Sequence, residues 1–139
     1  MKSFATNARI HASRERIWGL LTDASSWTSW NPTVVRIDGK IALGEKVTVH
    51  ARLAPGRAFP VRVSELVPNE RMVWTGGMPL GLFRGERTYL LAPRDGAVEF
   101  SMREVFSGLL APLIGKSIPD MQRTFDEFAA SLKKAAEES

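Results

Sequence analysis

The feature that most constrains this 139-residue chain is a continuous series of strand-like segments from Val34 to Phe106. Within it, stretches of alternating apolar and polar residues are separated by short turn signals such as Asp38–Gly39 and Asp95–Gly96. Alternation with a period of two predicts strands with one buried face, and an Asp-Gly pair is typical of a hairpin turn. Six consecutive strands with such short connections are expected to form an antiparallel meander.

A strand and a short helix are predicted before the meander. The run SFATNARIHA alternates between two faces, which indicates a strand. Ser13 then stands where a helix N-cap is expected, and Ile17, Leu20 and Leu21 follow at helical spacing. A second short helical turn should follow and end at Asn31–Pro32, because the residue before a proline is disfavoured in the α conformation.

A long amphipathic helix is predicted at the end of the chain. Large apolar residues recur there at steps of four, three and four: Met121, Phe125, Phe128 and Leu132. The range 119–137 would form a helix about 28 Å long, and Ser117 with Asp120 resembles a capping box before it. A sheet that is covered on one face needs such an element against it. We therefore expect a single α+β domain comprising residues 1–139.

The composition excludes several kinds of site. The chain has no cysteine, which removes disulfides, thiolate metal ligands, iron–sulfur clusters and a cysteine nucleophile. Its two histidines, His11 and His50, lie far apart and in no metal-binding pattern, so we expect no metal site. The chain contains no GxGxxG motif, phosphate loop or GxSxG nucleophile elbow, and we expect no cofactor.

The net charge of +4 does not point to a nucleic-acid partner. Basic residues are spread from Lys2 to Lys134, and the single adjacent pair is Lys133–Lys134, whereas a nucleic-acid binder concentrates its charge. The N-terminus does not resemble a signal peptide, and no stretch approaches the roughly 18 apolar residues of a membrane-spanning helix. We expect a cytoplasmic protein without stable membrane insertion, either a monomer or a homodimer.

Four stretches that together span almost the whole chain carry a family resemblance. They are IHASRERIWGLLTDASSWTSWNP, VSELVPNERMVWTGG, RTYLLAPRDGAVEFSMREVFSG and the terminal helix that ends in SLKKAAEE. In this order they resemble the SRPBCC superfamily, also called the START-like, birch-pollen-allergen-like or helix-grip fold, and within it the polyketide cyclase/dehydrase-type branch. The resemblance implies a curved seven-stranded antiparallel sheet wrapped around the C-terminal helix, two short helices after the first strand, and a cavity between sheet and helix.

The polar candidates for a site are Arg87 and Glu104. Each shares a strand face with apolar residues that the resemblance places toward the cavity. Because a buried charge must be paired or hydrated, the plainer interpretation is a salt bridge in the cavity wall. The alternatives are a polar anchor for a ligand and the catalytic acid–base pair of a cyclase that orients an enolising substrate. A slip of one residue would reverse these assignments, and Gly85 is a candidate bulge.

The apolar candidates for ligand binding come from the meander and the terminal helix. They are Trp74, Phe83, Tyr89, Phe100, Met102, Phe106, Met121, Phe125 and Phe128. The same residue types line pockets and fill cores. A cavity of roughly 300 Å³ or more would favour ligand binding, whereas a solidly packed interior would favour a site on the outer surface. The glycine-rich stretch Gly76–Leu82 is a candidate gate, or a plain hairpin loop.

Two of the four tryptophans, Trp27 and Trp30, lie three residues apart in the segment DASSWTSWNP. No basic cluster accompanies them, so base stacking is not supported. The resemblance places this segment on short helices at one end of the sheet. We therefore expect both rings to pack there, with their indole N–H groups reaching a partner or water.

Three functions remain open at this stage. The favoured one is the binding of a small hydrophobic molecule, such as a lipid, a polyketide or an aromatic metabolite, because strong catalytic signals are missing. The second is a polyketide cyclase/aromatase-like enzyme that uses an acid–base pair in the cavity. The third is a protein-interaction module of the chaperone-activator type, which an exposed apolar patch would favour.

Overall fold

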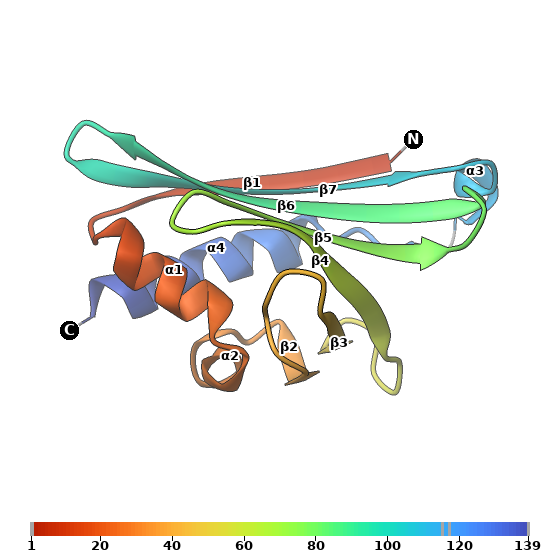
Figure 1. The fold of residues 1–139 in the computed structure, drawn as a ribbon, viewed down its shortest axis with the longest axis horizontal. Helices are drawn as coiled ribbons and strands as arrows, with labels where there is room; N and C mark the ends of the chain where they lie inside the picture. Colours follow the sequence, from red (N-terminus) through yellow and green to blue (C-terminus); the bar gives the residue numbers. More distant parts are fainter. Residues whose placement is uncertain (1, 115, 117, 139) are drawn as a thin grey trace.

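A curved seven-stranded antiparallel sheet lies over one long C-terminal helix in the computed structural model, which describes residues 2–114, 116 and 118–138 (Figure 1). The elements are β1 (Lys2–Ile10), α1 (Arg14–Thr22), the short 3-10 helix η1 (Ala24–Ser26), α2 (Trp27–Trp30), β2 (Val34–Asp38), β3 (Lys46–Ala51), β4 (Phe59–Val67), β5 (Arg71–Met78), β6 (Phe83–Arg94), β7 (Ala97–Ser107), α3 (Ala111–Ile114) and α4 (Gln122–Glu137). The predicted α+β helix-grip architecture is thereby confirmed.

The sheet is a meander closed by the first strand. Its order is β1-β7-β6-β5-β4-β3-β2, so each of the six later strands pairs with its sequence neighbour and β1 returns to pair with β7. On β6, Tyr89 and Leu91 are buried whereas Leu90 is exposed, which confirms the predicted register. Arg87 lies opposite Glu104 of β7 in that register.

Gly85, the candidate for a β-bulge, does not form one. Gly85 pairs regularly with Gly76 on one side and Phe106 on the other, and the register shifts occur in β2 and β4 instead. A Cβ atom at Gly85 would lie 3.3 Å from the Phe106 ring. The glycine therefore admits a neighbouring aromatic ring rather than an extra residue in the strand.

The glycine-rich connection between β5 and β6 is shorter than expected. Gly76 and Gly77 belong to β5 and pair with β6, so the connecting loop contains residues 79–82 only. A Cβ atom at Gly77 would lie 2.4 Å from the carbonyl oxygen of Phe83, and Gly77 has a φ of 132°. Here glycine allows the two backbones to pair closely, which removes most of the candidate gate.

Helix α4 provides the apolar face that covers the concave side of the sheet. Phe125, Phe128 and Leu132 are at most 1% exposed. The helix begins at Gln122 rather than at the expected position 119, and Ser117 lies outside the described residues. The reason is local, because the carboxylate of Asp120 accepts a hydrogen bond from the Gln122 amide at 3.0 Å and ends the preceding irregular segment there.

The attachment of α4 to its surroundings is one-sided. Hydrogen bonds tie its side chains and last carbonyls to β1, to the residue that follows β1, and to α1: Thr6 to Asp126, Gln122 to Ala5, Lys133 to Arg9, the His11 amide to Glu137, and Arg16 to Ala136. Among the described residues, no hydrogen bond joins α4 to β2 or β3. The helix is therefore fastened along the β1 edge and only packed on the β2–β3 side.

The two neighbouring tryptophans pack at the end of the grip, as expected. Trp27 is fully buried, donates its indole N–H to the carbonyl of Leu21 at 3.1 Å, and stacks on Trp74 with ring centroids 5.3 Å apart. Trp30 is partly exposed and donates to the hydroxyl of Ser26 at 3.3 Å. No helix in the described ranges is long and apolar enough to span a membrane.

Replacing Trp27 should test this packing. We expect Trp27→Ala to lower the free energy of unfolding by about 3–5 kcal/mol, because a fully buried ring is lost and a cavity remains. Trp30→Ala is the matched control and should cost clearly less, since that ring is partly in solvent. Urea denaturation of both variants measures the difference, and equal losses would contradict the central position assigned to Trp27.

Candidate functional site

The inward-facing polar centre of the sheet is the ion pair between Arg87 of β6 and Glu104 of β7. Arg87 Nε lies 2.8 Å from Glu104 Oε1, and the two side chains are 20% and 14% exposed. The guanidinium carbon of Arg87 lies 4.9 Å from the centroid of the Phe125 ring on α4. The pair is thus held between the sheet and the terminal helix, where the sequence predicted it.

The ionisation of this centre follows from its surroundings. Burial opposes the charge of Arg87, but the Glu104 carboxylate and Tyr89 together raise the pKa of Arg87 above its ordinary value. Burial raises the pKa of Tyr89 to about 12, although the Arg87 guanidinium acts in the opposite direction. Near neutral pH the centre therefore contains a charged guanidinium and a neutral phenol.

Three buried side-chain polar groups make no hydrogen bond within the described protein atoms, although one of them, Tyr89, is close enough to the Arg87 guanidinium for that charge to act on its pKa. They are Asn31 Nδ2, Trp74 Nε1 and Tyr89 Oη, on side chains that are at most 3% exposed. Trp74 packs edge-on against Tyr89 with ring centroids 5.2 Å apart. A buried donor without an acceptor costs about 1–3 kcal/mol, so each calls for an explanation.

Two acceptor oxygens of this interior are already engaged. The Asn31 side-chain oxygen accepts from the amide and the hydroxyl of Thr33, at 3.0 and 2.6 Å, and Glu104 accepts from Arg87. The interior therefore presents a guanidinium, an indole N–H and a phenol that can still donate. Its chemistry complements a group that brings acceptor oxygens, such as a carboxylate or a ketone.

The cavity between α4 and the β2–β3 side is narrow. Its volume is about 50 Å³, and it is lined by Thr33, Val34, Val49, Ala51, Leu53, Arg87, Met102, Met121, Thr124, Phe125 and Phe128. That is room for a few water molecules and is far below the roughly 300 Å³ of a small-molecule pocket. Aromatic rings occupy the rest of the grip, because Phe128 contacts the rings of Trp27, Tyr89 and Phe100.

The apolar candidates from the sequence divide into three groups in the structure. Four line the narrow cavity: Met102, Met121, Phe125 and Phe128. Three belong to the buried core beside it: Trp74, Tyr89 and Phe100. The remaining two, Phe83 and Phe106, stack on each other with centroids 5.8 Å apart and do not line the cavity.

Some residues of the site were missed by the sequence reasoning. Asn31 was seen only as a helix stop, and nothing in its local sequence indicates a buried, half-satisfied amide. Val49, Ala51 and Leu53 carried a usable signal, because they alternate along one strand face and that face now borders the cavity.

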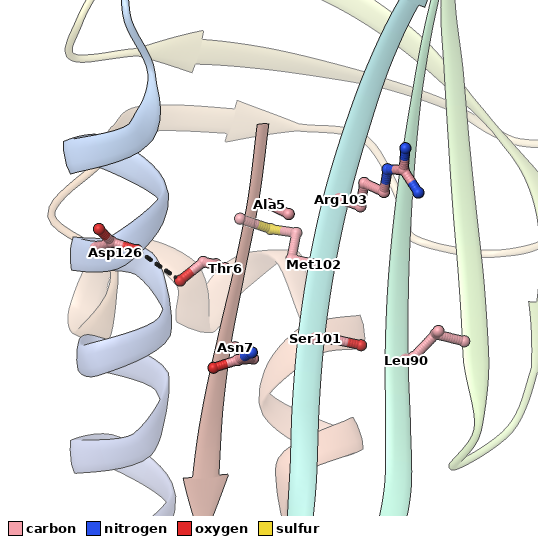
Figure 2. Close-up of a pocket in the computed structure, with 8 residues that line it drawn as sticks. All are labelled: Ala5, Thr6, Asn7, Leu90, Ser101, Met102, Arg103 and Asp126. Carbon is pink, nitrogen blue, oxygen red and sulfur yellow. Dashed lines mark hydrogen bonds between the residues drawn. The ribbon is translucent and has the colours of Figure 1, made fainter. Parts of the chain in front are cut away.

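A larger hollow lies across β1, β7 and β6, mostly on the outer face of the sheet (Figure 2). Its volume is about 460 Å³, and its lining residues are Ala5, Thr6, Asn7, Leu90, Ser101, Met102, Arg103 and Asp126. Neither the Arg87–Glu104 pair nor any of the unpaired donors lines it. Despite its size, it is the weaker candidate, since it is an open depression without a convergent polar group.

The fold and this interior define a helix-grip protein of the SRPBCC type. Residues 1–137 match the family described as polyketide cyclase/dehydrase and lipid transport, and the chain belongs to that family. The resemblance inferred from the sequence is thereby confirmed. No curated protein sequence matches the chain.

Solved structures with the same fold come from several sources. The match to a Helicobacter pylori protein covers 97% of this chain and 88% of that protein, at 16% identity and a TM-score of 0.77. The match to the Aha1 dimer from Colwellia psychrerythraea covers 99% of this chain and 98% of that chain, at 20% identity and a TM-score of 0.75. The match to a putative protein of the dynemicin biosynthetic locus covers 99% of this chain and 48% of that chain, at 15% identity and a TM-score of 0.74. At these identities the likeness establishes the fold alone.

Tyr89 is the single tyrosine of the chain, which makes its burial directly measurable. Tyrosinate absorbance should titrate with a midpoint near pH 12 in the folded protein and near 10 in urea. Because the pKa of Tyr89 is higher in the folded than in the unfolded protein, deprotonation of Tyr89 favours unfolding. The stability of the fold is therefore unaffected by this group below about pH 10 and falls as the pH rises toward 12. Tyr89→Phe should lose less stability over that interval, and a native midpoint near 10 would contradict the buried phenol.

A double-mutant cycle should show how the ion pair contributes to stability. We expect Arg87→Met and Glu104→Leu each to lower the free energy of unfolding by about 3–5 kcal/mol, because each leaves a buried charge unpaired. The double variant should be within about 1 kcal/mol of the parent or more stable. As a control, Arg84→Met breaks the exposed Arg84–Glu86 pair and should cost at most about 1 kcal/mol. Urea denaturation measures all four, and a cost for the single variants no larger than that of the control would refute a buried pair.

Proposed function

We propose that the protein binds a small amphipathic molecule, with an apolar body and a head that carries hydrogen-bond-acceptor oxygens, in the grip between α4 and the sheet. The observation that carries the proposal is the pair of buried donors next to Arg87, the Trp74 indole and the Tyr89 hydroxyl, neither of which has a hydrogen-bond acceptor in the described protein. A carboxylate or ketone oxygen placed there would accept from Tyr89 and Arg87 and would remove the cost of an unpaired phenol. Carboxylated lipids, polyketides and oxygenated aromatic metabolites all have this chemistry, and the family description supports such ligands.

The ligand enters from the β2–β3 side. Residues of β2, β3 and α4 line the narrow cavity there, and no hydrogen bond between described residues joins α4 to those strands. A ligand of about 300 Å³ or more requires these walls to separate, since the present volume is about 50 Å³. Met102 and Met121 suit a wall that repacks, because methionine side chains are flexible and unbranched.

Ligand preference tests the proposal. Dodecanoate and dodecylammonium share one apolar chain and differ in the head, and each can be titrated against the protein by calorimetry. We expect saturable binding of dodecanoate that is at least tenfold tighter than that of dodecylammonium, because the interior offers donors and a guanidinium. The absence of saturable binding by either compound, or equal affinities, would refute the proposed head-group chemistry.

Removal of one hydroxyl tests the role of the phenol. Tyr89→Phe should weaken dodecanoate binding about fivefold, the equivalent of one hydrogen bond of about 1 kcal/mol. Thr88→Val is the matched control, since it removes a hydroxyl from the adjacent residue, which faces the outer side of β6. Equal affinities of the two variants would show that the Tyr89 hydroxyl does not contact the ligand.

A second candidate function is catalysis by the same centre. The observation that favours it is the Glu104 carboxylate, 14% exposed and 2.8 Å from Arg87. Such a carboxylate could take a proton from an enolising ketone while the Arg87 guanidinium and the Tyr89 hydroxyl stabilise the enolate oxygen. Glu104→Gln should then abolish turnover of a poly-β-ketothioester while binding persists. Equal loss of binding and turnover would favour a binding or structural role for the pair.

A further inference from the structure

One end of the molecule presents an exposed apolar surface that the core does not use. Met78, Leu80, Leu109 and Leu113 are 49%, 91%, 80% and 68% exposed. We call these four residues the apolar end. A single exposed leucine is ordinary, but several large apolar residues on adjoining segments form a patch that calls for a partner.

The backbone holds these residues together. The amides of Leu109 and Leu110 donate to the carbonyls of Gly81 and Leu82, at 3.1 and 2.7 Å, so the segment after β7 is fixed against the β5–β6 loop. A Cβ atom at Gly108 would lie 2.8 Å from both of those carbonyls, which shows how closely the two segments approach. Figure 1 shows α3 beside this connection, at the right-hand end of the sheet. The surface is therefore built by hydrogen-bonded structure.

The start of β4 extends the apolar end. The carbonyl of Pro60 would lie 2.9 Å from a Cβ atom at Gly76, so the first residues of β4 run beside the last residues of β5. Phe59 and Leu53, on either side of the β3–β4 turn, are 41% and 42% exposed. The start of β4 thus adds Phe59 next to the last residues of β5, whereas Leu53 lines the grip.

The charges of these segments have one sign. The ranges 52–62, 76–84 and 106–116 contain five basic residues and no acidic residue, although the whole chain has 19 basic and 15 acidic residues. The five are Arg52, Arg57, Arg62, Arg84 and Lys116. Arg84 is paired with Glu86, just beyond its range, but Arg52 and Arg62 donate to neutral backbone carbonyls, which leaves their charge uncompensated. The segments that form the apolar end and the adjoining β3–β4 turn therefore carry net positive charge.

We infer that the apolar end docks on the surface of an anionic lipid bilayer, with its leucines in the headgroup region and the arginines and Lys116 facing lipid phosphates. Apolar side chains that enter the interface and basic residues that attract anionic headgroups together provide such binding. A second copy of the chain is disfavoured as the occupant, because a two-fold contact would bring two positively charged surfaces together. The inference does not depend on a ligand in the grip.

Co-sedimentation with vesicles tests the inference. The probes are vesicles of phosphatidylcholine alone and vesicles that also contain about 30% phosphatidylglycerol, which supply the negative surface charge. We expect the protein to bind the anionic vesicles, to bind the neutral ones far more weakly, and to dissociate as salt screens the surface. The leucines are tested by Leu80→Glu and Leu109→Glu, each of which should reduce binding at least about fivefold.

Matched controls separate the apolar end from the rest of the surface. Leu90→Glu makes the same change at a leucine that is 37% exposed on the outer face of β6, far from the β5–β6 loop, and it should retain binding within about twofold. Arg57→Ser should weaken binding, whereas Arg94→Ser, at the β6–β7 hairpin at the other end of the sheet, should not. Because all these side chains are exposed, circular dichroism should show an unchanged fold in every variant.

The remaining outcomes would overturn the inference. A protein that does not sediment with anionic vesicles has no such surface. Equal losses for Leu80→Glu and Leu90→Glu would mean that binding is not located at the apolar end. A stable dimer that Leu80→Glu converts to a monomer, measured by light scattering, would assign the surface to a second copy of the chain.

Discussion

The contact on which the rest of the structure depends is the packing of Phe128 of α4 into the concave side of the sheet. Its ring meets Trp27 and Trp30 from the short α2 helix, Tyr89 from β6 and Phe100 from β7. One side chain thus joins the first helical region, two central strands and the terminal helix. The same contact fills the space in which a ligand-sized cavity would otherwise lie, so stability and ligand access oppose each other at this point.

Polar groups within this apolar interior give the grip its chemical character. An ion pair that is mostly buried contributes little net stability compared with apolar residues, although loss of one partner is costly. Arg87 and Glu104 are therefore poorly explained as stabilising elements alone. Together with the raised pKa of Tyr89 and the unpaired buried donors, they are the features on which the proposed binding of an oxygen-bearing ligand rests. The one-sided attachment of α4 offers a route for that exchange.

Large apolar residues have two different uses in this chain. Many of those in β1, β6, β7 and α4 face the grip, whereas Leu80 and Leu109 in connections and Leu113 in the short helix α3 remain in solvent. Leu53 belongs to the cavity lining and also lies beside the turn next to that end. The β3–β4 segment therefore contributes Leu53 to the wall of the grip and runs, from Phe59 on, beside the last residues of β5.

The sequence by itself determined the order of elements, the meander and the inward orientation of Arg87 and Glu104. The first two follow from local periodicity and turn chemistry, which one stretch of chain carries alone, whereas the inward orientation also required the family resemblance to say which strand face meets the cavity. Only the tertiary structure decided the narrow volume of the cavity, the separation of Phe83 and Phe106 from it, and the unpaired amide of Asn31. It also decided that Gly85 accommodates a ring instead of a bulge, and that Leu80 and Leu109 lie on one surface. These properties depend on volumes and contacts shared by residues far apart in sequence, and spacing along the chain does not encode them.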